Sequence, residues 1–216
     1  MSRITIIGGN GKVARRLSRI LTQQGHEVTA WIRSSAQSFH VRKTGAKPII
    51  INVEPLAAET MAVLLKGEDA VVWSAGAGGG NPRRTKAVDH HAAIRSMQAA
   101  AIAGVSRYVM VSWFYDYPNH GVSPEVPFYH YAQAKLAADT FLRESDLDWT
   151  ILGPSGLSDE PGTGLIELGG QRSQVSRDDV AHVAAQTLAR PATIGQVINF
   201  NNGTTPIGEA LDSLAN

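Results

Sequence analysis

The stretch Ile4-Thr5-Ile6-Ile7-Gly8-Gly9-Asn10-Gly11-Lys12-Val13-Ala14 decides the fold of this chain. Its first four residues are all β-branched, which indicates a short buried strand. From Gly11 onward the apolar residues follow helical spacing, so a helix begins directly after the glycine turn. This order predicts a phosphate-binding cradle, because the free N–H groups at the start of the helix point at the turn.

The glycines of the turn let bare backbone approach a ligand, and Ala14 is small enough for the helix to lie close to the strand. The spacing G-x-x-G-x-x-A differs from the G-x-G-x-x-G of ordinary dehydrogenases. An ordinary strand-to-helix turn without a ligand is the alternative for this stretch alone. We predict a dinucleotide site whose first contacts come from Gly8, Gly9, Asn10, Gly11, Lys12 and Val13.

The composition bounds the class of protein. The chain has 216 residues, 43% of them hydrophobic and 18% charged, which fits one domain with a full core. The net charge is +1, and the densest basic group is Arg83, Arg84 and Lys86, which we expect to be a solvated loop and helix start. We therefore expect no nucleic-acid partner, since phosphate backbones need clustered positive charge.

The sequence also limits the kinds of reactive site and the cellular locations that we expect. The chain has no cysteine and no metal-ligand spacing, so we predict no disulfide, no thiolate catalysis and no metal. No apolar run approaches membrane-spanning length, and the first strand begins too early to leave room for a signal peptide. We expect a cytoplasmic protein without a membrane partner.

Strand and helix patterns alternate along the rest of the chain. The expected strands are 4–7, 27–32, 48–51, 70–73, 108–112, 149–152 and 197–200, and the expected later helices are 57–66, 84–103, 129–144 and 178–189. Such alternation predicts an α/β fold, a Rossmann-like doubly wound parallel sheet flanked by helices, in a single domain over 1–216. Two irregular segments, 113–130 and 153–176, are expected to form small elements on the substrate side.

Ligands of open parallel sheets bind beyond the C-terminal ends of the strands, so the residue after each strand matters. Strand 27–32 is followed by Arg33, where an acidic residue would hold the ribose of NAD. An arginine here can pair with the 2′-phosphate of NADP, although a plain surface arginine is the alternative. We therefore predict NADP (NADPH) as the cofactor, with NAD less favoured.

The next two strands end in small or polar residues. Asn52 and Val53 follow strand 48–51 and are placed to meet the adenine. Ser74, Ala75 and Gly76 open the glycine-rich loop 74–80 and leave room for the cofactor backbone.

Tyr131 and Lys135 lie four residues apart on the expected helix 129–144, so they share a face. A lysine ammonium beside a phenol lowers the pKa of the phenol. A tyrosine tuned in this way can pass a proton to or from a carbonyl or alcohol oxygen. We predict these two residues as a catalytic pair, and the alternative is an exposed helix pair with no role.

These features together make the chain resemble the atypical short-chain dehydrogenase/reductase family, in its small single-domain NmrA-like and epimerase/dehydratase-like branch. The resemblance covers nearly the whole chain and rests on residues 8–14, Arg33, 74–76, 103–112, Tyr131 with Lys135, 152–157 and 176–181. It implies a Rossmann-type fold, NADP binding and reductase or epimerase chemistry. It would place Lys135 on the nicotinamide ribose, and it would place against the nicotinamide the residues Pro154, Ser155, Gly156 and Leu157.

The chain departs from the family pattern after strand 108–112. Active members usually carry a Ser or Thr there that holds the substrate oxygen. Here Ser112 stands one residue early, still at the strand end, and Trp113-Phe114-Tyr115 follow. Ser112 and Tyr115 are therefore the two candidate catalytic hydroxyls, with Tyr115 as a possible substitute for the family residue.

Seven of the fourteen aromatic residues lie between residues 113 and 131, which suits a flat substrate such as a flavin or quinone. The sequence therefore predicts an NADP-dependent oxidoreductase that moves a hydride between the nicotinamide and a small carbonyl, quinone or flavin-like substrate. The alternatives are a non-catalytic NADP-binding redox sensor and an NAD(P)-dependent sugar epimerase or dehydratase. The oligomeric state stays open.

Overall fold

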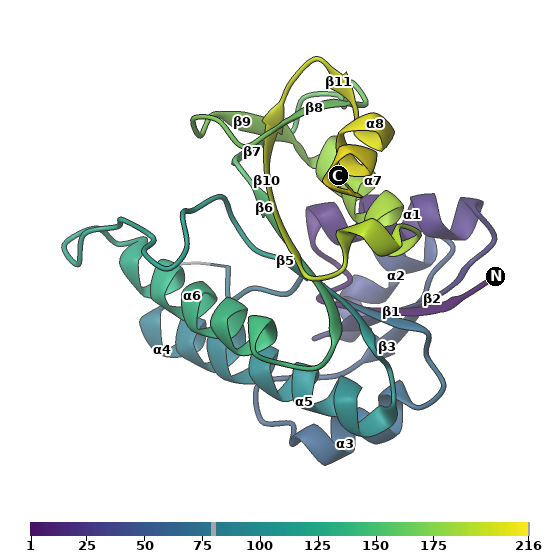
Figure 1. Cartoon of the computed structure of the whole chain (residues 1–216). Coiled ribbons are helices and arrows are strands. Elements are labelled where there is room, and N and C mark those ends of the chain that lie inside the picture. The colour runs from purple at the N-terminus through teal and green to yellow at the C-terminus, as the bar shows by residue number, and fades with distance from the viewer. Residues whose placement is uncertain (79–80, 216) are drawn as a thin grey trace.

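The computed structural model describes residues 1–78 and 81–215, so the last two positions of the loop 74–80 and residue 216 lie outside the described residues. The strands of the main sheet are β1 (Arg3–Ile7), β2 (Glu27–Ile32), β3 (Lys47–Ile50), β4 (Ala70–Trp73), β5 (Arg107–Val111), β6 (Asp148–Pro154), β8 (Leu165–Leu168), β10 (Gln196–Asn202) and β11 (Thr205–Pro206). Within the described ranges they form a nine-stranded sheet in the order β11-β8-β10-β6-β5-β4-β1-β2-β3 (Figure 1).

The strands from β3 to β10 are parallel, and the direction in which the chain adds strands reverses between β1 and β4. From β1 the chain proceeds to β2 and β3 on one side, and from β4 to β5, β6 and β10 on the other. This is the doubly wound arrangement that the sequence predicted, and its switch point opens a crevice at the C-terminal ends of β1 and β4.

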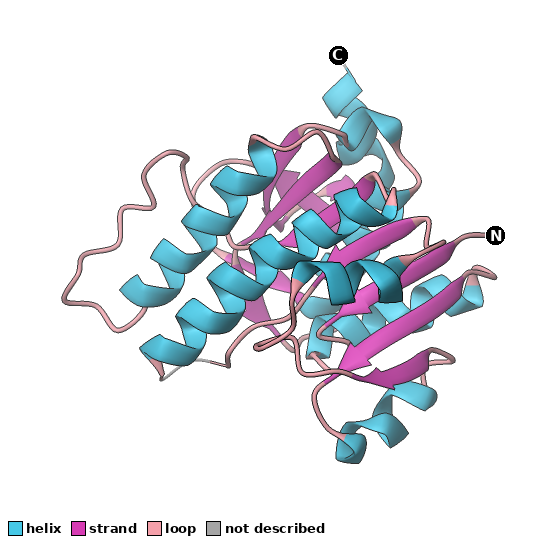
Figure 2. Ribbon diagram, turned by 90° about the horizontal axis from the view of Figure 1, so that it is seen from below, coloured by secondary structure: helices cyan, strands magenta, loops and turns pink. Residues whose placement is uncertain are grey.

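The helices cover both faces of the sheet (Figure 2). They are α1 (Lys12–Gln23), α2 (Ser38–Arg42), α3 (Ala58–Leu65), α4 (Pro82–Thr85), α5 (Ala93–Ala103), α6 (Tyr129–Arg143), α7 (Arg177–Leu188) and α8 (Ile207–Asp212). A π-helical segment, Lys86–Ala92, joins α4 to α5. Helix α1 packs on α7 over one face, and α5 packs between α3 and α6 over the other.

The core is divided by the sheet into two apolar clusters. Ile6 and Val72 belong to the cluster under α1 and α7, whereas Ile7 and Trp73 belong to the cluster under α3, α5 and α6. Successive strand residues point to opposite faces, and both faces are covered. This two-sided burial explains why β4 is a continuous apolar run and why residues 4–7 of β1 are all buried.

The structure differs from the sequence expectation mainly after β6. Segment 153–176 was expected as a loop region with small elements, but its β8 pairs antiparallel with β10, and β11 pairs antiparallel with β8, so the sheet is not wholly parallel. This extension covers the hydrogen-bonding edge that β10 would otherwise expose. A separate two-stranded sheet joins β7 (Gly156–Ser158) to β9 (Gln174–Ser176).

Most other expected boundaries lie within one or two residues of the observed ones. Helix 84–103 begins earlier, at Pro82, because Asn81 accepts a hydrogen bond from the N–H of Arg84 and a proline suits the first helical turn. The short helices α2 and α8 were not predicted. Segment 113–128 contains neither helix nor strand, as expected. None of the helices in the described residues is long and apolar enough to cross a membrane.

Candidate functional site

The glycine turn between β1 and α1 contains glycines of two kinds. Gly8 has φ +88°, and a Cβ there would lie 2.5 Å from the backbone nitrogen of Ala75, while a Cβ on Gly9 would lie 2.5 Å from the Cβ of Ala30. Gly8 is therefore fixed by packing against the loop after β4, and Gly9 by packing against β2. Gly11 has φ −59°, and its nearest neighbour to an added Cβ is the carbonyl oxygen of Gly8 at 3.3 Å. The fold thus tolerates a side chain at Gly11 far better than at Gly8 or Gly9.

The start of α1 is open to an anion. Gly11 is its N-cap residue and provides no side-chain acceptor for the first-turn N–H groups. The Oδ1 atom of Asn10 is buried and has no hydrogen-bond partner among the described residues. Free N–H groups and the positive end of the helix dipole at a glycine turn fit a pyrophosphate.

A cavity of about 300 Å³ opens beside this turn, at the crevice between the strand ends. It brings together most of the predicted cofactor residues, namely Gly8, Asn10, Gly11, Arg33, Asn52, Val53, Ser74, Ala75 and Gly76. Gly9 and Val13 instead pack into the protein, and the Lys12 side chain turns toward Asp159. The adenosine half of the predicted site is therefore a single cavity, with the Lys12 ammonium outside it.

Arg33 stands exposed at the rim of this cavity. Its guanidinium forms no ion pair in the part of the chain that the structure describes. Its backbone N–H donates to Oε1 of Gln37 at 3.2 Å, and the Ser34 hydroxyl accepts from the N–H of Ala36 and caps the following turn. The local backbone is thus fixed while the cationic group stays available to an anion.

Two arginines hold the loop that follows β3. Arg84 donates to Oε1 of Glu54 and to the carbonyl oxygen of Ala77, both at 2.8 Å, and so joins two walls of the cavity. Arg95 donates to the carbonyl oxygens of Val53, Glu54 and Leu56. The expectation that Arg84 belongs to a solvated basic group is corrected by these contacts. Glu54 is thirty residues away, and no sequence spacing links the two.

Two further cavities continue along the same edge of the sheet. One, of about 760 Å³, lies between the residues 76–78 and Tyr131, and the other, of about 520 Å³, lies between Tyr131, Ser112 and the residues 154–157. Residues 76–78 also line the first cavity, and Tyr131 lines both of the others. The three spaces therefore adjoin, and they run from Arg33 to Leu157 past the Tyr131 side chain.

The two candidate hydroxyls after β5 meet on one buried carboxylate. Ser112 Oγ and Tyr115 Oη both donate to Oδ2 of Asp139, the latter at 3.0 Å. Burial raises the pKa of Asp139, and nearby Lys135 and these hydrogen bonds oppose the shift. Because both hydroxyl protons are directed to Asp139, neither is free to donate to a substrate oxygen in this arrangement.

Lys135 is also buried, at 1% exposed, and lines none of the three cavities. Its Nζ lies 3.1 Å from the carbonyl oxygen of Val111 and 2.9 Å from the Sδ of Met110. Burial lowers its pKa, and the charges of Asp139 and Asp89 oppose that shift. The structure therefore holds the Lys135 ammonium against the end of β5.

Tyr131 lies at the meeting point of the two larger cavities. Its pKa is raised well above the ordinary value, first by burial and then by the charges of Asp89 and Asp139. This is opposite to the lowered pKa expected from a neighbouring lysine. Asp89 itself is buried beneath the loop after β4 and accepts from the N–H of Ala77 at 3.0 Å. The phenol of Tyr131 thus keeps its proton at neutral pH.

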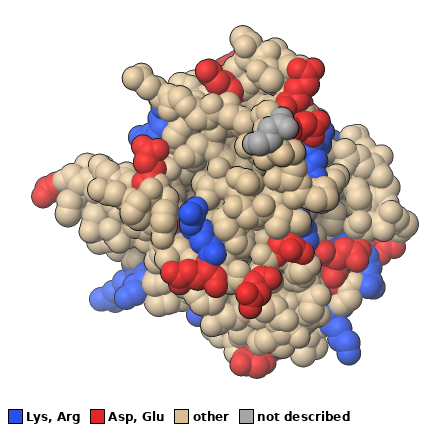
Figure 3. All heavy atoms as spheres, viewed as in Figure 1, with Lys and Arg blue, Asp and Glu red and all other residues tan. Residues whose placement is uncertain are grey.

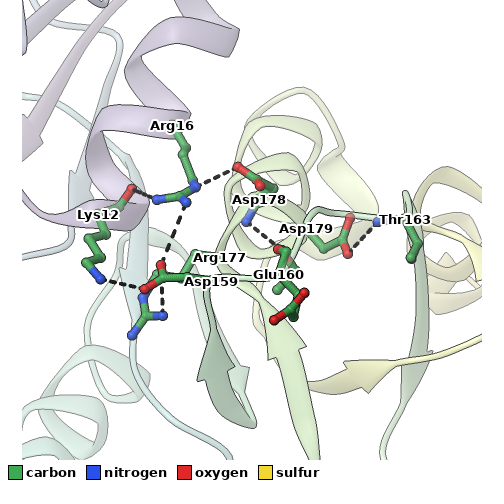
Figure 4. A network of polar contacts seen from close by, with 9 residues as sticks. Lys12, Arg16, Asp159, Glu160, Thr163, Arg177, Asp178 and Asp179 are labelled. Atoms are coloured by element: carbon green, nitrogen blue, oxygen red, sulfur yellow. Dashed lines mark hydrogen bonds and ion pairs between the residues drawn. The ribbon is translucent and has the colours of Figure 1, made fainter.

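A network of charges fastens the segment after β7 to the glycine turn (Figure 4). Asp159 binds Lys12 at 2.5 Å and Arg177 at 3.1 Å, and Arg16 lies between Asp159 and Asp178. Lys12 and Arg16 lie on α1, and Asp159 lies 147 residues beyond Lys12 in the sequence. The sequence signal was partial, since residues 176–181 were recognised as a family stretch but were not linked to α1. The face of the molecule in Figure 3 shows acidic and basic groups interspersed.

A doubly wound sheet with a glycine turn, an uncapped helix start and a cavity at the switch point defines a dinucleotide-binding enzyme of the Rossmann type. The chain belongs to the NAD(P)H-binding family, whose model matches residues 8–191. The resemblance to atypical short-chain dehydrogenases/reductases and the prediction of an NAD(P)-dependent oxidoreductase of that type are thereby confirmed.

Individual relatives support this assignment over the whole chain. The sugar epimerase YhfK of Bacillus subtilis, itself uncharacterized, is 34% identical over 98% of this chain and all of its own length. An NAD-dependent epimerase/dehydratase structure from Bacillus halodurans has a TM-score of 0.90 and 32% identity, covering 99% of this chain and 100% of that one. The oxidoreductase ylbE of Lactococcus lactis has a TM-score of 0.88 and 31% identity, covering 98% and 96%.

Proposed function

We propose that this protein is an NADP-dependent reductase of a small carbonyl, quinone or flavin-like substrate. The observation that carries the proposal is the run of adjoining cavities, which leads from the cation of Arg33 past Tyr131 to the residues 154–157. NADPH, when bound, supplies a hydride. The glycine turn and the start of α1 bind its pyrophosphate, and residues 154–157 close the nicotinamide end of the site.

The preference for NADP rests on Arg33. The guanidinium is unpaired among the described residues, and no acidic side chain follows β2 to hold ribose hydroxyls. A planar guanidinium binds a phosphate through two parallel hydrogen bonds.

Arg33→Ala should weaken NADP binding by about 1.5–3 kcal/mol, the range for a charge-assisted hydrogen bond, and leave NAD binding nearly unchanged. Isothermal titration of both cofactors measures this difference. Arg42→Ala, an exposed arginine of α2 outside the cavity lining, is the matched control and should alter neither affinity. An equal loss of affinity for NADP and NAD in Arg33→Ala would show that Arg33 does not bind the 2′-phosphate.

Tyr131 is the proposed proton donor, because it alone of the four candidate catalytic residues presents a side chain to two adjoining cavities. Ser112 and Tyr115 act through Asp139, whose orientation they fix. Lys135 lies on α6 one turn after Tyr131, and its positive charge acts on the carboxylate of Asp139. Lys135 and the two hydroxyls are thus positioning residues in this proposal.

The decisive experiment is NADPH oxidation, followed at 340 nm, with panels of quinones, flavins and aldehydes. Turnover above the buffer rate with any panel supports the reductase. Tight NADP binding without turnover of any member favours the redox sensor, which is the second candidate because Asp139 holds both strand-end hydroxyls.

The epimerase alternative follows from the name of the Bacillus subtilis relative. That chemistry begins with oxidation of a sugar alcohol, which requires a group that accepts a proton. Because Tyr131 keeps its proton at neutral pH, no deprotonated phenol is present there to accept a proton from the alcohol. We therefore place reduction before epimerisation in this proposal.

A further inference from the structure

The cavity at the end of β5 and β6 has an aromatic wall. Trp113 and Phe128 meet edge to face, with ring centroids 4.9 Å apart and an interplanar angle of 82°, and Phe128 lies 5.0 Å from Tyr131. Tyr115 stacks on Trp113, with ring centroids 5.2 Å apart, and helps to fix the indole. The opposite side of the cavity is formed by residues 154–157. Such a space suits a flat ring system.

One cation stands at this wall. Among the described residues that line the cavity, Arg172 alone is charged. Its Cζ lies 5.2 Å from the centroid of the Trp113 ring, and its Nη1 reaches the carbonyl oxygen of Phe114 only at 3.5 Å. No carboxylate pairs with it within the described ranges. Stacking on the indole orients the guanidinium plane while leaving most of its N–H donors unused.

Building on the proposed reductase function, we propose that the substrate is a planar molecule carrying an anionic group, a carboxylate or a phosphate. Its ring lies against Trp113 and Phe128, and its anion binds Arg172 through charge-assisted hydrogen bonds. A neutral flat molecule would use the aromatic wall and leave Arg172 without a partner. The anion thus fixes which end of the ring system enters the cavity toward Tyr131.

The test uses pairs of ligands that share a ring and differ in charge. FMN and riboflavin have the same isoalloxazine, and only FMN carries a phosphate. Anthraquinone-2-carboxylate and its amide form the corresponding carboxylate pair. Binding to the NADP-saturated protein is measured by fluorescence quenching or calorimetry, so the result does not depend on turnover.

The wild type should bind the anionic member of at least one pair about tenfold or more tightly than the neutral member. Arg172→Gln should abolish that ratio, Arg172→Lys should keep part of it, and Arg42→Gln, which removes the same charge elsewhere, should keep it whole. A preference within the flavin pair indicates a phosphate-bearing substrate, and a preference within the anthraquinone pair indicates a carboxylate-bearing one. Equal binding of both members in both pairs, or a ratio unchanged in Arg172→Gln, overturns the proposal.

The two proposals fail in different ways. If the anion preference appears in binding but NADPH is not oxidised by any ligand, the reductase function falls and the anion site stands. If NADPH is oxidised equally well by both members of both pairs, in wild type and in Arg172→Gln, the reductase stands and the anion site falls.

Discussion

Gly11→Val is expected to weaken NADP(H) binding by at least about 1000-fold, or about 4 kcal/mol, while the protein stays folded. Gly11 lines the cavity at the start of α1, where the backbone must lie against the pyrophosphate. A valine would place two methyl groups between the helix N-terminus and the ligand. The free N–H groups could then not form hydrogen bonds of normal length with the phosphate oxygens.

The fold should survive because Gly11 has an ordinary φ of −59°, and the nearest atom to an added Cβ, the carbonyl oxygen of Gly8 at 3.3 Å, needs to shift only slightly. Valine is a poorer N-cap than glycine, so we expect a loss in unfolding free energy of about 1 kcal/mol. Thermal unfolding checks the stability, and calorimetric titration checks the affinity. Gly208→Val on α8, a distant glycine whose added Cβ meets only the ends of flexible side chains, is the control and should bind NADP normally.

Gly8→Ala should give the opposite pattern. Its Cβ would collide with the backbone at Ala75, and its φ of +88° disfavours any side chain. The free energy of unfolding of Gly8→Ala should fall, while the folded fraction of that variant should still bind NADP. If Gly11→Val binds NADP like the wild type, the glycine turn is a packing feature and not a phosphate cradle.

The contrast between these glycines shows what the sequence could and could not predict. The strand, turn and helix of residues 4–14 follow from local propensity and from a pattern that repeats within a few residues. The same holds for β2 and β4, whose observed bounds equal the expected ones. Which glycine serves packing and which serves the ligand depends on Ala30 and Ala75, which only the folded sheet brings near.

Parts of the site that depend on distant partners could not be predicted in this way. Asp139 shares a helix with Tyr131, but its contacts with Ser112 and Tyr115 arise because β5 and α6 pack together. Arg172 lay in a segment expected as a loop, and its stacking on Trp113 joins residues about sixty positions apart. Apolar spacing carries no information on such pairs, since the two members lie on separate segments of the chain.

Tyr131 was predicted as half of a catalytic pair whose phenol has a lowered pKa, and the structure reverses the sign of that shift. The prediction considered only Lys135, four residues along the helix. In the structure the lysine turns to the carbonyl of Val111, and the carboxylates of Asp89 and Asp139 act on the phenol together with burial. The phenol therefore carries its proton at neutral pH, and its place at two adjoining cavities makes it the candidate proton donor.

This assignment leads to a sharp difference between substrates. Tyr131→Phe should lower kcat/KM for carbonyl reduction by about 100- to 10,000-fold, the range for loss of a general acid. A carbonyl oxygen gains negative charge as it receives a hydride, and it needs a proton donor in place. Flavins and quinones spread that charge over a conjugated ring, so their reduction should fall by less than about tenfold in the same variant.

Steady-state NADPH oxidation with an aldehyde and with a flavin, on the same enzyme preparations, measures both effects. Tyr129→Phe removes a hydroxyl from the same helix at a position outside the cavity linings and should leave both rates unchanged. NADP affinity should be equal in wild type and Tyr131→Phe, because the phenol lies beyond the cavity lined by the glycine turn. Because the phenol keeps its proton throughout the neutral range, carbonyl reduction should show no loss of rate from Tyr131 between about pH 6 and 9. If Tyr131→Phe reduces aldehydes as fast as the wild type, another group or water donates the proton, and Tyr131 serves only as part of the aromatic wall.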